Sequence, residues 1–238
     1  MTLVLRPLVL VLGLLATLVA CTAPPPAPGV NDPFEATNRA RFEANMALLP
    51  SARAEAPPRP NPFRRAVANV GDLLGTPSSI LNDVLQLRPD HAVENALRLT
   101  INATVGLGGI LDPAGHLGIH GRRSDFGETL HRWGVGEGAY VVLPLFGPST
   151  ERDAAGLVVD LAIDPLRFVL PPREFGWSLA LRGAGQFASA AENADLLDAN
   201  VMSTADPYAQ ARLLYLQSRR YHLGVETEDE FIDPYADF

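Results

Sequence analysis

Three residues of this 238-residue chain have the types and the spacing of a metal site. Asp112, His116 and His120 recur every four residues, and on a helix this interval would place three ligands on one face. One proline and two glycines lie between them, however, and these residue types interrupt helices. We therefore expect no helix over this segment, and we predict no metal site there.

Other acidic residues have the chemistry of general acid–base catalysis but not its arrangement. Nothing in the spacing of Asp125, Glu128 and Glu137 pairs two carboxylates beside a pocket. The motifs H-E-x-x-H, G-x-S-x-G and C-x-x-C are absent from the sequence. The chain has arginine but no lysine, which excludes Schiff-base chemistry and P-loop phosphate binding. We expect a protein that is not an enzyme and that uses no cofactor.

Two glycine clusters resemble the phosphate-binding turns of nucleotide-binding proteins. They are Gly106, Gly108 and Gly109, and Gly134, Gly136 and Gly138. Neither cluster follows a convincing strand or has the full glycine spacing, and both are too rich in glycine for a regular helix. We predict that most of these glycines adopt positive φ or touch another backbone closely.

The single cysteine, Cys21, indicates where the protein resides. It follows an uncharged apolar run, residues 8–20, with Arg6 ahead of it. The run is too short to span a bilayer comfortably and is typical of a secretory signal peptide. Residues 18–21 (LVAC) resemble a lipobox, in which the cysteine is acylated and becomes the first residue of the mature chain. An ordinary signal peptide with a chance buried cysteine is the alternative.

The residue after the cysteine and the stretch that follows complete this prediction. Thr22 is not the Asp that retains lipoproteins in the inner membrane, so we expect attachment to the outer membrane on its periplasmic side. We predict a signal peptide over residues 1–20 and a lipid anchor with a proline-rich tether over residues 21–31.

Net charge narrows the choice of partners. The formal net charge of −8 argues against nucleic acid, which requires a cationic surface. The stretch over residues 226–238 is rich in acids and has no basic residue. We expect a disordered tail there, with a docking tail for a basic partner as the alternative.

Short polar residues followed by proline predict four helix starts. The pairs are Asp32-Pro33, Asn61-Pro62, Thr76-Pro77 and Asp206-Pro207. The polar side chain caps free N–H groups, and proline fits the first helical position because its missing N–H has no partner there. Glu35 adds a capping box to the first of these starts.

Hydrophobic periodicity extends the helical prediction over most of the chain. Apolar residues recur every four positions from Val93 to Val105, with Glu94 and Arg98 expected to pair on the opposite side. Further helices are predicted over residues 151–163, 174–195 and 206–221, the last with Leu213, Leu214 and Leu216 toward the core. Tyr140 to Leu143 is the only predicted strand. We expect one mostly α domain over residues 32–225.

Two segments are distinctive because they combine glycine with irregular patterning. They cover residues 98–115 and residues 125–153. A long irregular stretch is either functional or disordered. Trp133, Tyr140 and Phe146 argue against disorder in the second segment.

These two segments closely resemble the MlaA (VacJ) family of outer-membrane lipoproteins. The central motif is F-G-x-T-L followed by G-V-G-x-G-x-Y-V-x-L-P and a nearby R-D, from Phe126 to Asp153. The beginning of the mature domain also fits, since Asp32-Pro33-Phe34-Glu35 precedes Asn38-Arg39 and Phe42. Asp206-Pro207-Tyr208 matches a later family pattern, and the resemblance extends to about Tyr221.

The resemblance implies a fold and a function. Family members are helical rings in the inner leaflet of the outer membrane, with a central amphipathic channel and irregular glycine-rich connections. They take mislocalised phospholipid from the outer leaflet and pass it to a soluble periplasmic carrier, with trimeric porins as membrane partners. No covalent chemistry is implied.

The resemblance also suggests roles for individual residues. Arg98, Arg132 and Arg152 are candidates to contact lipid phosphate, with pairing to nearby carboxylates as the alternative. The six clustered glycines and Tyr140 are candidates to shape the channel walls. Two other functions stay open, a lipid-anchored envelope adaptor that moves no lipid and a hydrolase that acts on lipid.

Overall fold

The computed structural model describes residues 30–48, 61–192 and 201–225. The predicted signal peptide, nearly all of the anchor and tether, and the acidic tail lie outside these residues. The helices are α2 (Glu35–Leu48), α3 (Pro62–Leu85), α4 (Pro89–Thr104), α5 (Pro113–His116), α6 (Phe126–Arg132), α7 (Glu151–Ile163), α8 (Pro165–Val169), α9 (Pro172–Glu192) and α11 (Pro207–Leu223), and the strands are β1 (Tyr140–Leu143) and β2 (Gly147–Thr150). The prediction of a mostly α fold is confirmed.

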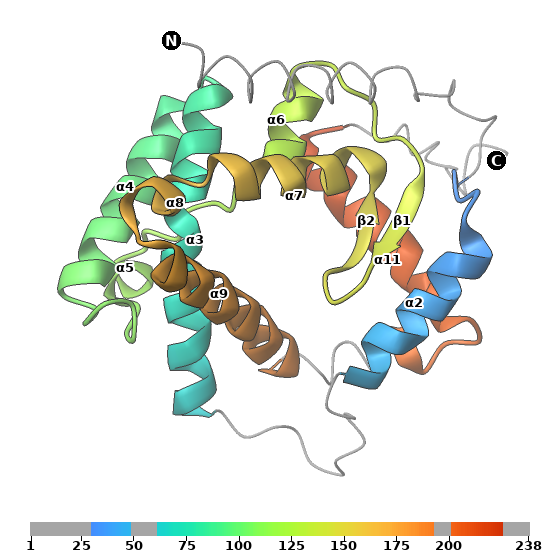
Figure 1. Ribbon diagram of the computed structural model, residues 1–238, viewed down its shortest axis with the longest axis horizontal. Coiled ribbons are helices and arrows are strands. Elements are labelled where there is room, and N and C mark those ends of the chain that lie inside the picture. Colours follow the sequence, from blue (N-terminus) through green and yellow to red (C-terminus); the bar gives the residue numbers. More distant parts are fainter. Residues whose placement is uncertain (1–29, 49–60, 193–200, 226–238) are drawn as a thin grey trace, which may run out of the picture.

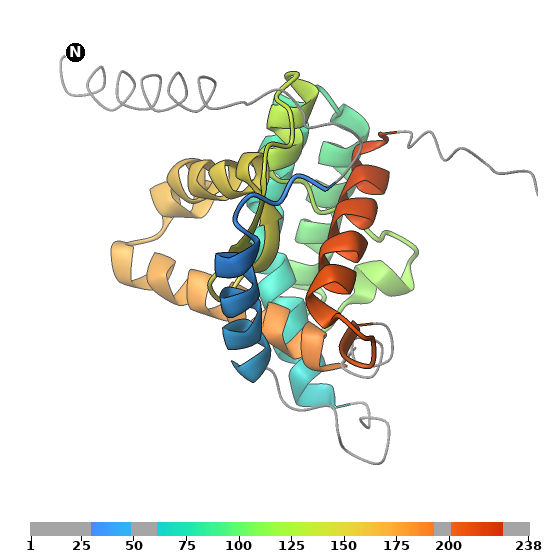
Figure 2. The ribbon, with the colours of Figure 1, turned by 90° about the vertical axis from the view of Figure 1, so that its right-hand side faces the viewer.

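The elements form an open ring (Figure 1). The long helix α3 packs against α4 on one side and α9 on the other. Helix α7 closes one side of the ring, while the β1–β2 hairpin, α11 and α2 form the side opposite α3 (Figure 1). Ion pairs connect α2 and α11 (Figure 2): Arg39 of α2 pairs with Asp206 just before α11, and Arg212 of α11 pairs with Asp32 just before α2. In the described part of the chain, no helix is both long and apolar enough to cross a membrane.

Polar caps start two of the helices as predicted. The Asn61 side chain accepts from the backbone N–H groups of residues 63 and 64, and Asp206 accepts from that of Ala209. The Thr76-Pro77 prediction is wrong, because both residues lie inside α3. Proline removes one helical hydrogen bond there, but packing against α4 and α9 keeps the helix continuous.

Asp32 does not use its carboxylate as the predicted capping box requires. It accepts instead from the side chains of Asn38, Tyr208 and Arg212. These bonds fasten the beginning of the described chain to α11, so a residue predicted to act locally acts across the fold.

The β hairpin was half predicted. Strand β1 has the predicted bounds, and β2 pairs with it antiparallel, with Tyr140 opposite Thr150. Strand β2 was not predicted because it begins with Gly147 and Pro148, and both residue types are unusual within strands. The amide of Asn38, fully buried on α2, donates to the Tyr140 carbonyl and accepts from the Val142 N–H, so it satisfies the free edge of β1.

The segments expected to be irregular contain two short helices, α5 and α6. Each is capped by an aspartate, since the Asp112 carboxylate accepts from the Gly115 N–H and that of Asp125 from the Glu128 N–H. The expectation that residues 112–120 contain no helix is therefore wrong for a single turn. Helix α6 was missed because glycine and aromatic residues surround it in the sequence.

A small apolar core lies between α2, β1 and α11. Its buried members are Phe42, Tyr140, Val142, Val201, Tyr208 and Leu216. The predicted burial of Leu216 is confirmed, but Leu213 and Leu214 are exposed. The inward face of α11 bears arginine and tyrosine side chains that bond to aspartates elsewhere in the ring, which turns those two leucines outward.

Helix α4 has the reverse of the usual amphipathic arrangement. Its buried residues are Asn95 and Asn102, whereas Val93, Leu97 and Val105 are 50–68% exposed. The predicted pairing of Glu94 with Arg98 is wrong, because Arg98 pairs with Asp72 and Asp112 and Glu94 accepts from the Gly121 N–H. Polar groups therefore hold α4 to the ring, and its apolar stripe faces outward.

Candidate functional site

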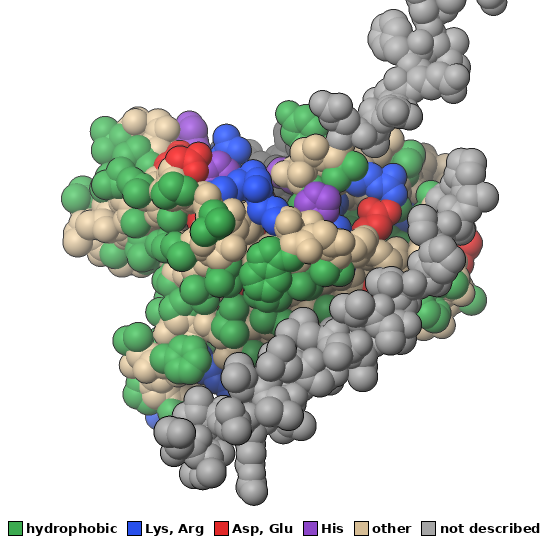
Figure 3. Space-filling model, turned by 90° about the horizontal axis from the view of Figure 1, so that it is seen from above, with side chains coloured by type: hydrophobic (Ala, Val, Ile, Leu, Met, Phe, Trp, Pro, Cys, Tyr) green, Lys and Arg blue, Asp and Glu red, His purple; other side chains and the backbone are tan. Residues whose placement is uncertain are grey.

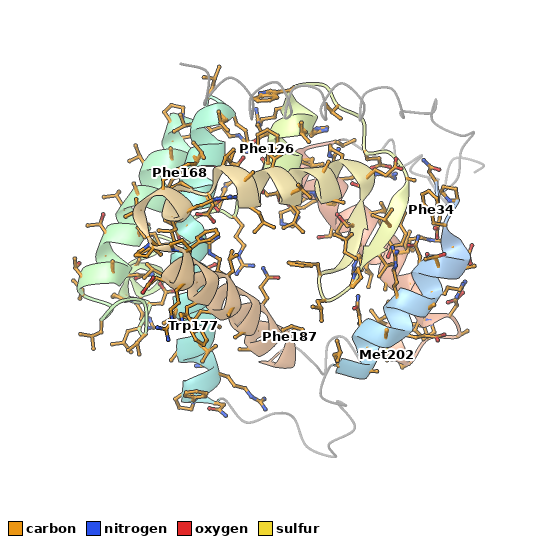
Figure 4. The ribbon with its side chains drawn as sticks, in the orientation of Figure 1. Phe34, Phe126, Phe168, Trp177, Phe187 and Met202 are labelled. Carbon is orange, nitrogen blue, oxygen red and sulfur yellow. The ribbon has the colours of Figure 1, made fainter. Side chains whose placement is uncertain are left out.

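A cavity of about 230 Å³ lies between the N-terminus of α6, α7, the hairpin and α11. Its apolar lining comes from Leu143, Phe146, Pro148 and Leu157. Its polar lining comes from Asp125, Ser149, Asp153, Asp160, Tyr215 and Arg219. Side chains from α7, α9 and the hairpin point into the centre of the ring (Figure 4). The lining can accept a molecule with one charged part and one apolar part.

Arg219 holds the polar side of this cavity together. Its guanidinium donates to both oxygens of Asp125, at 2.6 and 2.9 Å, and to both oxygens of Asp153, at 2.9 and 3.1 Å. Burial opposes the charge of Arg219, but the bonds to these carboxylates outweigh it and raise the pKa of the guanidinium further above its usual range. Arg219 is thus a fixed cation in the wall.

Asp153 is stabilised as a carboxylate by several donors. Besides Arg219, it accepts from the Tyr215 hydroxyl at 2.8 Å and from Arg152 Nε at 3.0 Å. Burial alone would raise the pKa of Asp153, but the hydrogen bond and charge of Arg219 outweigh that effect and lower the pKa. This carboxylate therefore stays ionised.

Asp160 has no such cation. One oxygen accepts from Asn82 Nδ2 at 2.7 Å and the other from the Phe126 N–H at 2.9 Å. Among the described residues, no arginine or histidine forms an ion pair with it. Burial, together with the nearby charges of Asp125 and Asp164, raises the pKa of Asp160 to about 6.

Comparison with known proteins identifies the family to which this ring and cavity belong. The model of the MlaA lipoprotein family matches residues 30–222. The chain belongs to the MlaA lipoprotein family. The resemblance seen in the sequence motifs is thus confirmed.

Three similar MlaA relatives carry the name "Intermembrane phospholipid transport system lipoprotein MlaA". Those of Escherichia coli (strain K12) and Shigella flexneri are each 31% identical to this chain over 201 residues, covering 79% of it and 77% of the relative. That of Haemophilus influenzae is 30% identical over 220 residues and covers 85% of each chain.

A solved structure shares the fold. Its chain was described in work on the "Structural basis for maintenance of bacterial outer membrane lipid asymmetry". The TM-score is 0.62 at 27% identity, and the match covers 81% of this chain and 98% of that one.

The arginines singled out from the MlaA resemblance do not line the cavity. Arg98 pairs with Asp72 and Asp112, and the buried Arg152 pairs with Asp153, which is the carboxylate pairing held as the alternative for both. Arg132 is exposed on α6. A phosphate contact for any of the three stays a prediction.

Five of the six clustered glycines have the predicted geometry. Gly108, Gly109, Gly134 and Gly138 have φ between 71° and 88°. A Cβ on Gly106 would lie 2.5 Å from the Asn102 carbonyl oxygen. Gly136 has neither feature. Tyr140 is buried in the apolar core against Tyr208 and Tyr215 and is not among the residues that line the cavity, so a role for it in shaping a channel stays a prediction.

Sequence reasoning missed Arg219 and Asp160. Asp153 and Asp160 are seven residues apart in the predicted helix over residues 151–163, which places both on one face. Tyr208, Arg212, Tyr215 and Arg219 likewise recur at helical intervals. This spacing is the signal in the sequence from which the polar inward faces of α7 and α11 could have been predicted.

Proposed function

We propose that this chain transports phospholipid to maintain the lipid asymmetry of the outer membrane. It removes mislocalised phospholipid from the outer leaflet and passes it to a soluble periplasmic carrier. The observation that carries this proposal is the cavity with one apolar and one charged side, in a ring whose relatives are named as parts of a phospholipid transport system.

The cavity meets the main physical difficulty of moving a lipid. A phospholipid crosses a bilayer slowly because its charged headgroup would enter hydrocarbon. The side with Asp125, Asp153 and Arg219 offers the headgroup a polar surface, and the side with Leu143 and Leu157 suits the acyl chains. Irregular backbone such as the hairpin turn is tolerated at membrane depth where it lines a cavity.

The outer surface supports a position in the membrane interface. Besides the apolar stripe of α4, Phe168, Val169 and Trp177 on α8 and α9 are 61–77% exposed. Hydrophobic side chains are spread over the face in Figure 3, beside a smaller band of arginine and histidine side chains that also contains acidic side chains. Large exposed apolar patches mark contact with a membrane or a partner, and amphipathic helices of this kind lie in the membrane plane.

The anchor and the partners complete the proposal. Acylated Cys21 would hold the ring at the periplasmic side of the outer membrane, beside a trimeric porin, with a soluble carrier as the acceptor. Replacing Cys21 with Ala tests the anchor. We expect loss of lipoprotein processing at this site, whereas unchanged processing and outer-membrane fractionation would contradict the anchor.

A transfer assay tests the function. Full-length protein is reconstituted in vesicles with labelled phospholipid, and the periplasmic carrier is added outside. We expect intact lipid on the carrier, and less of it for Leu157→Arg in the cavity wall than for the matched control Leu213→Arg on the exposed side of α11. Labelled fatty acid or freed headgroup would indicate a hydrolase. Absence of transfer would favour the lipid-anchored adaptor that moves no lipid.

A further inference from the structure

The cavity wall is more negative than positive. Three aspartates line it, against one arginine, Arg219. Arg219 is already shared between two of these carboxylates, those of Asp125 and Asp153. The third, Asp160, keeps an uncompensated negative charge at the cavity surface.

Asp160 has room to accept further hydrogen bonds. Each of its oxygens accepts one protein donor, from Asn82 or from the Phe126 N–H. An ionised carboxylate offers about four acceptor positions, so about two stay available for a donor in the cavity. The Asn82 amide and the Phe126 N–H are both neutral, so neither supplies a positive charge to balance the Asp160 carboxylate.

Aromatic rings in the same wall favour a cation as well. Phe146 and Tyr215 line the cavity, and the Tyr215 hydroxyl is oriented by its bond to Asp153. Ring faces attract ammonium groups, at about 0.5–2 kcal/mol depending on desolvation. The wall therefore combines a carboxylate without a counterion and two aromatic side chains around one volume.

We propose that the cavity selects phospholipids whose headgroup bears an ammonium, ethanolamine in particular, with the Asp160 carboxylate as its acceptor. This inference rests on the proposed function, because it presumes that phospholipid enters the cavity. The phosphate is common to all phospholipids and does not discriminate between them. A glycerol headgroup has no positive charge to offer Asp160, and its lipid keeps a full net negative charge against this wall.

The selection depends on pH through Asp160. The charged groups around it are Asp125 beside α6, Asp153 and Asp164 at the two ends of α7, and Arg219 on α11. Arg219 and Asp153 both stay charged between pH 5 and pH 7.5, because each stabilises the charged form of the other. Protonation of Asp160 below about pH 6 removes the acceptor charge, so the preference fades on acidification.

Competitive lipid binding tests the inference. Full-length protein in detergent is mixed with equal amounts of dioleoyl phosphatidylethanolamine and dioleoyl phosphatidylglycerol, and native mass spectrometry counts each bound lipid at pH 7.5 and pH 5. We expect about a threefold preference for ethanolamine at pH 7.5, the size of a partly screened ion pair. The preference should disappear at pH 5 and in Asp160→Asn at either pH. The control Asp90→Asn, at an exposed position on α4, should behave as wild type.

The outcomes separate this inference from the function on which it rests. Equal binding of both lipids by the wild-type chain overturns the headgroup selection and leaves the transport proposal standing. Binding of neither lipid overturns the transport proposal as well. A preference that persists in folded Asp160→Asn overturns the assignment to Asp160. If that variant does not fold, the wild-type comparison between pH 7.5 and pH 5 decides, and a preference unchanged by pH overturns the assignment.

Discussion

Arg219 and Asp125 form a two-bonded ion pair across 94 positions of sequence. Nη2 lies 2.6 Å from Oδ1, and Nη1 lies 2.9 Å from Oδ2. The guanidinium fork matches the carboxylate geometry, which a lysine cannot reproduce. Because Arg219 also holds Asp153, one side chain fastens α11 to the start of α6 and of α7. The polar wall of the cavity is therefore also a structural joint.

Removal of Arg219 should destabilise the ring strongly. Arg219→Ala leaves the carboxylates of Asp125 and Asp153 without their main partner, a change that typically costs about 3–5 kcal/mol. We expect a clearly lower thermal midpoint in detergent, with partial recovery in Arg219→Lys. The exposed Arg132→Ala serves as the control and should change stability by less than about 0.5 kcal/mol. Equal midpoints for the two alanine variants would contradict the joint.

The raised pKa of Asp160 should make the stability of the fold depend on pH, and the sign of this dependence can be worked out. Its pKa is about 6 in the folded chain and 3.8 ordinarily, so between these values the folded chain holds a proton that the unfolded chain has released. The free energy of unfolding should therefore fall as pH rises through this window, by on the order of 3 kcal/mol for this group.

Asp160→Asn isolates that contribution. Aspartates with lowered pKa, such as Asp153, act in the opposite direction, but they are present in both proteins and cancel in the difference. We expect the variant to gain stability relative to wild type between about pH 4 and pH 7 in denaturant titrations. A difference that does not change with pH would refute the raised pKa.

Gly138 and Gly136 form a matched pair for testing backbone shape. Gly138 has φ of +71°, and an added Cβ would lie 2.6 Å from Glu151 Oε2, an atom that accepts from the Ala139 N–H. Gly136 has open space around it. Gly138→Ala should cost about 1–2 kcal/mol or more, while Gly136→Ala should cost little. Thermal unfolding measures both, and equal losses would show that left-handed backbone is not the reason for glycine here.

The apolar outer face should bind membranes without contributing to folding. Phe168→Asp with Val169→Asp, in a Cys21→Ser chain that lacks the anchor, should reduce flotation with phospholipid vesicles roughly tenfold or more, because each buried apolar side chain contributes about 1.5–3 kcal/mol. Thermal stability should stay within about 0.5 kcal/mol, since both side chains are exposed. Tyr221→Asp, at an exposed position on α11, is the control. Unchanged flotation of the double variant would place the membrane contact elsewhere.

Helix starts that depend on hydrogen bonds between neighbouring residues could be predicted from the sequence. The Asn61 and Asp206 caps act within one helical turn, so the starts of α3 and α11 could be predicted directly. Thr76-Pro77 has the same local pattern but lies inside α3, because packing against two neighbouring helices outweighs it.

The site itself was harder to predict because its bonds join distant segments. Arg219 reaches residues 66 and 94 positions away, and Asp160 bonds to Asn82, 78 positions away. Helical spacing could show which residues shared a face, but not which aspartate faced which arginine. Hydrophobic periodicity also misled for part of α11, since Leu213 and Leu214 are exposed while the arginine and tyrosine side chains of this helix turn inward.

Photo-crosslinking from the cavity wall tests most directly whether lipid occupies the ring. A photoreactive p-azidophenylalanine is placed at Leu157, which lines the cavity, or at Trp177, which is exposed on α9, and the full-length protein is irradiated in phospholipid vesicles. Mass spectrometry then identifies lipid attached to each position. We predict that phospholipid is attached at both positions, because lipid bathes the outer face and also enters the cavity. Attachment at Trp177 without attachment at Leu157 would contradict the account, since lipid would then surround the ring without entering it.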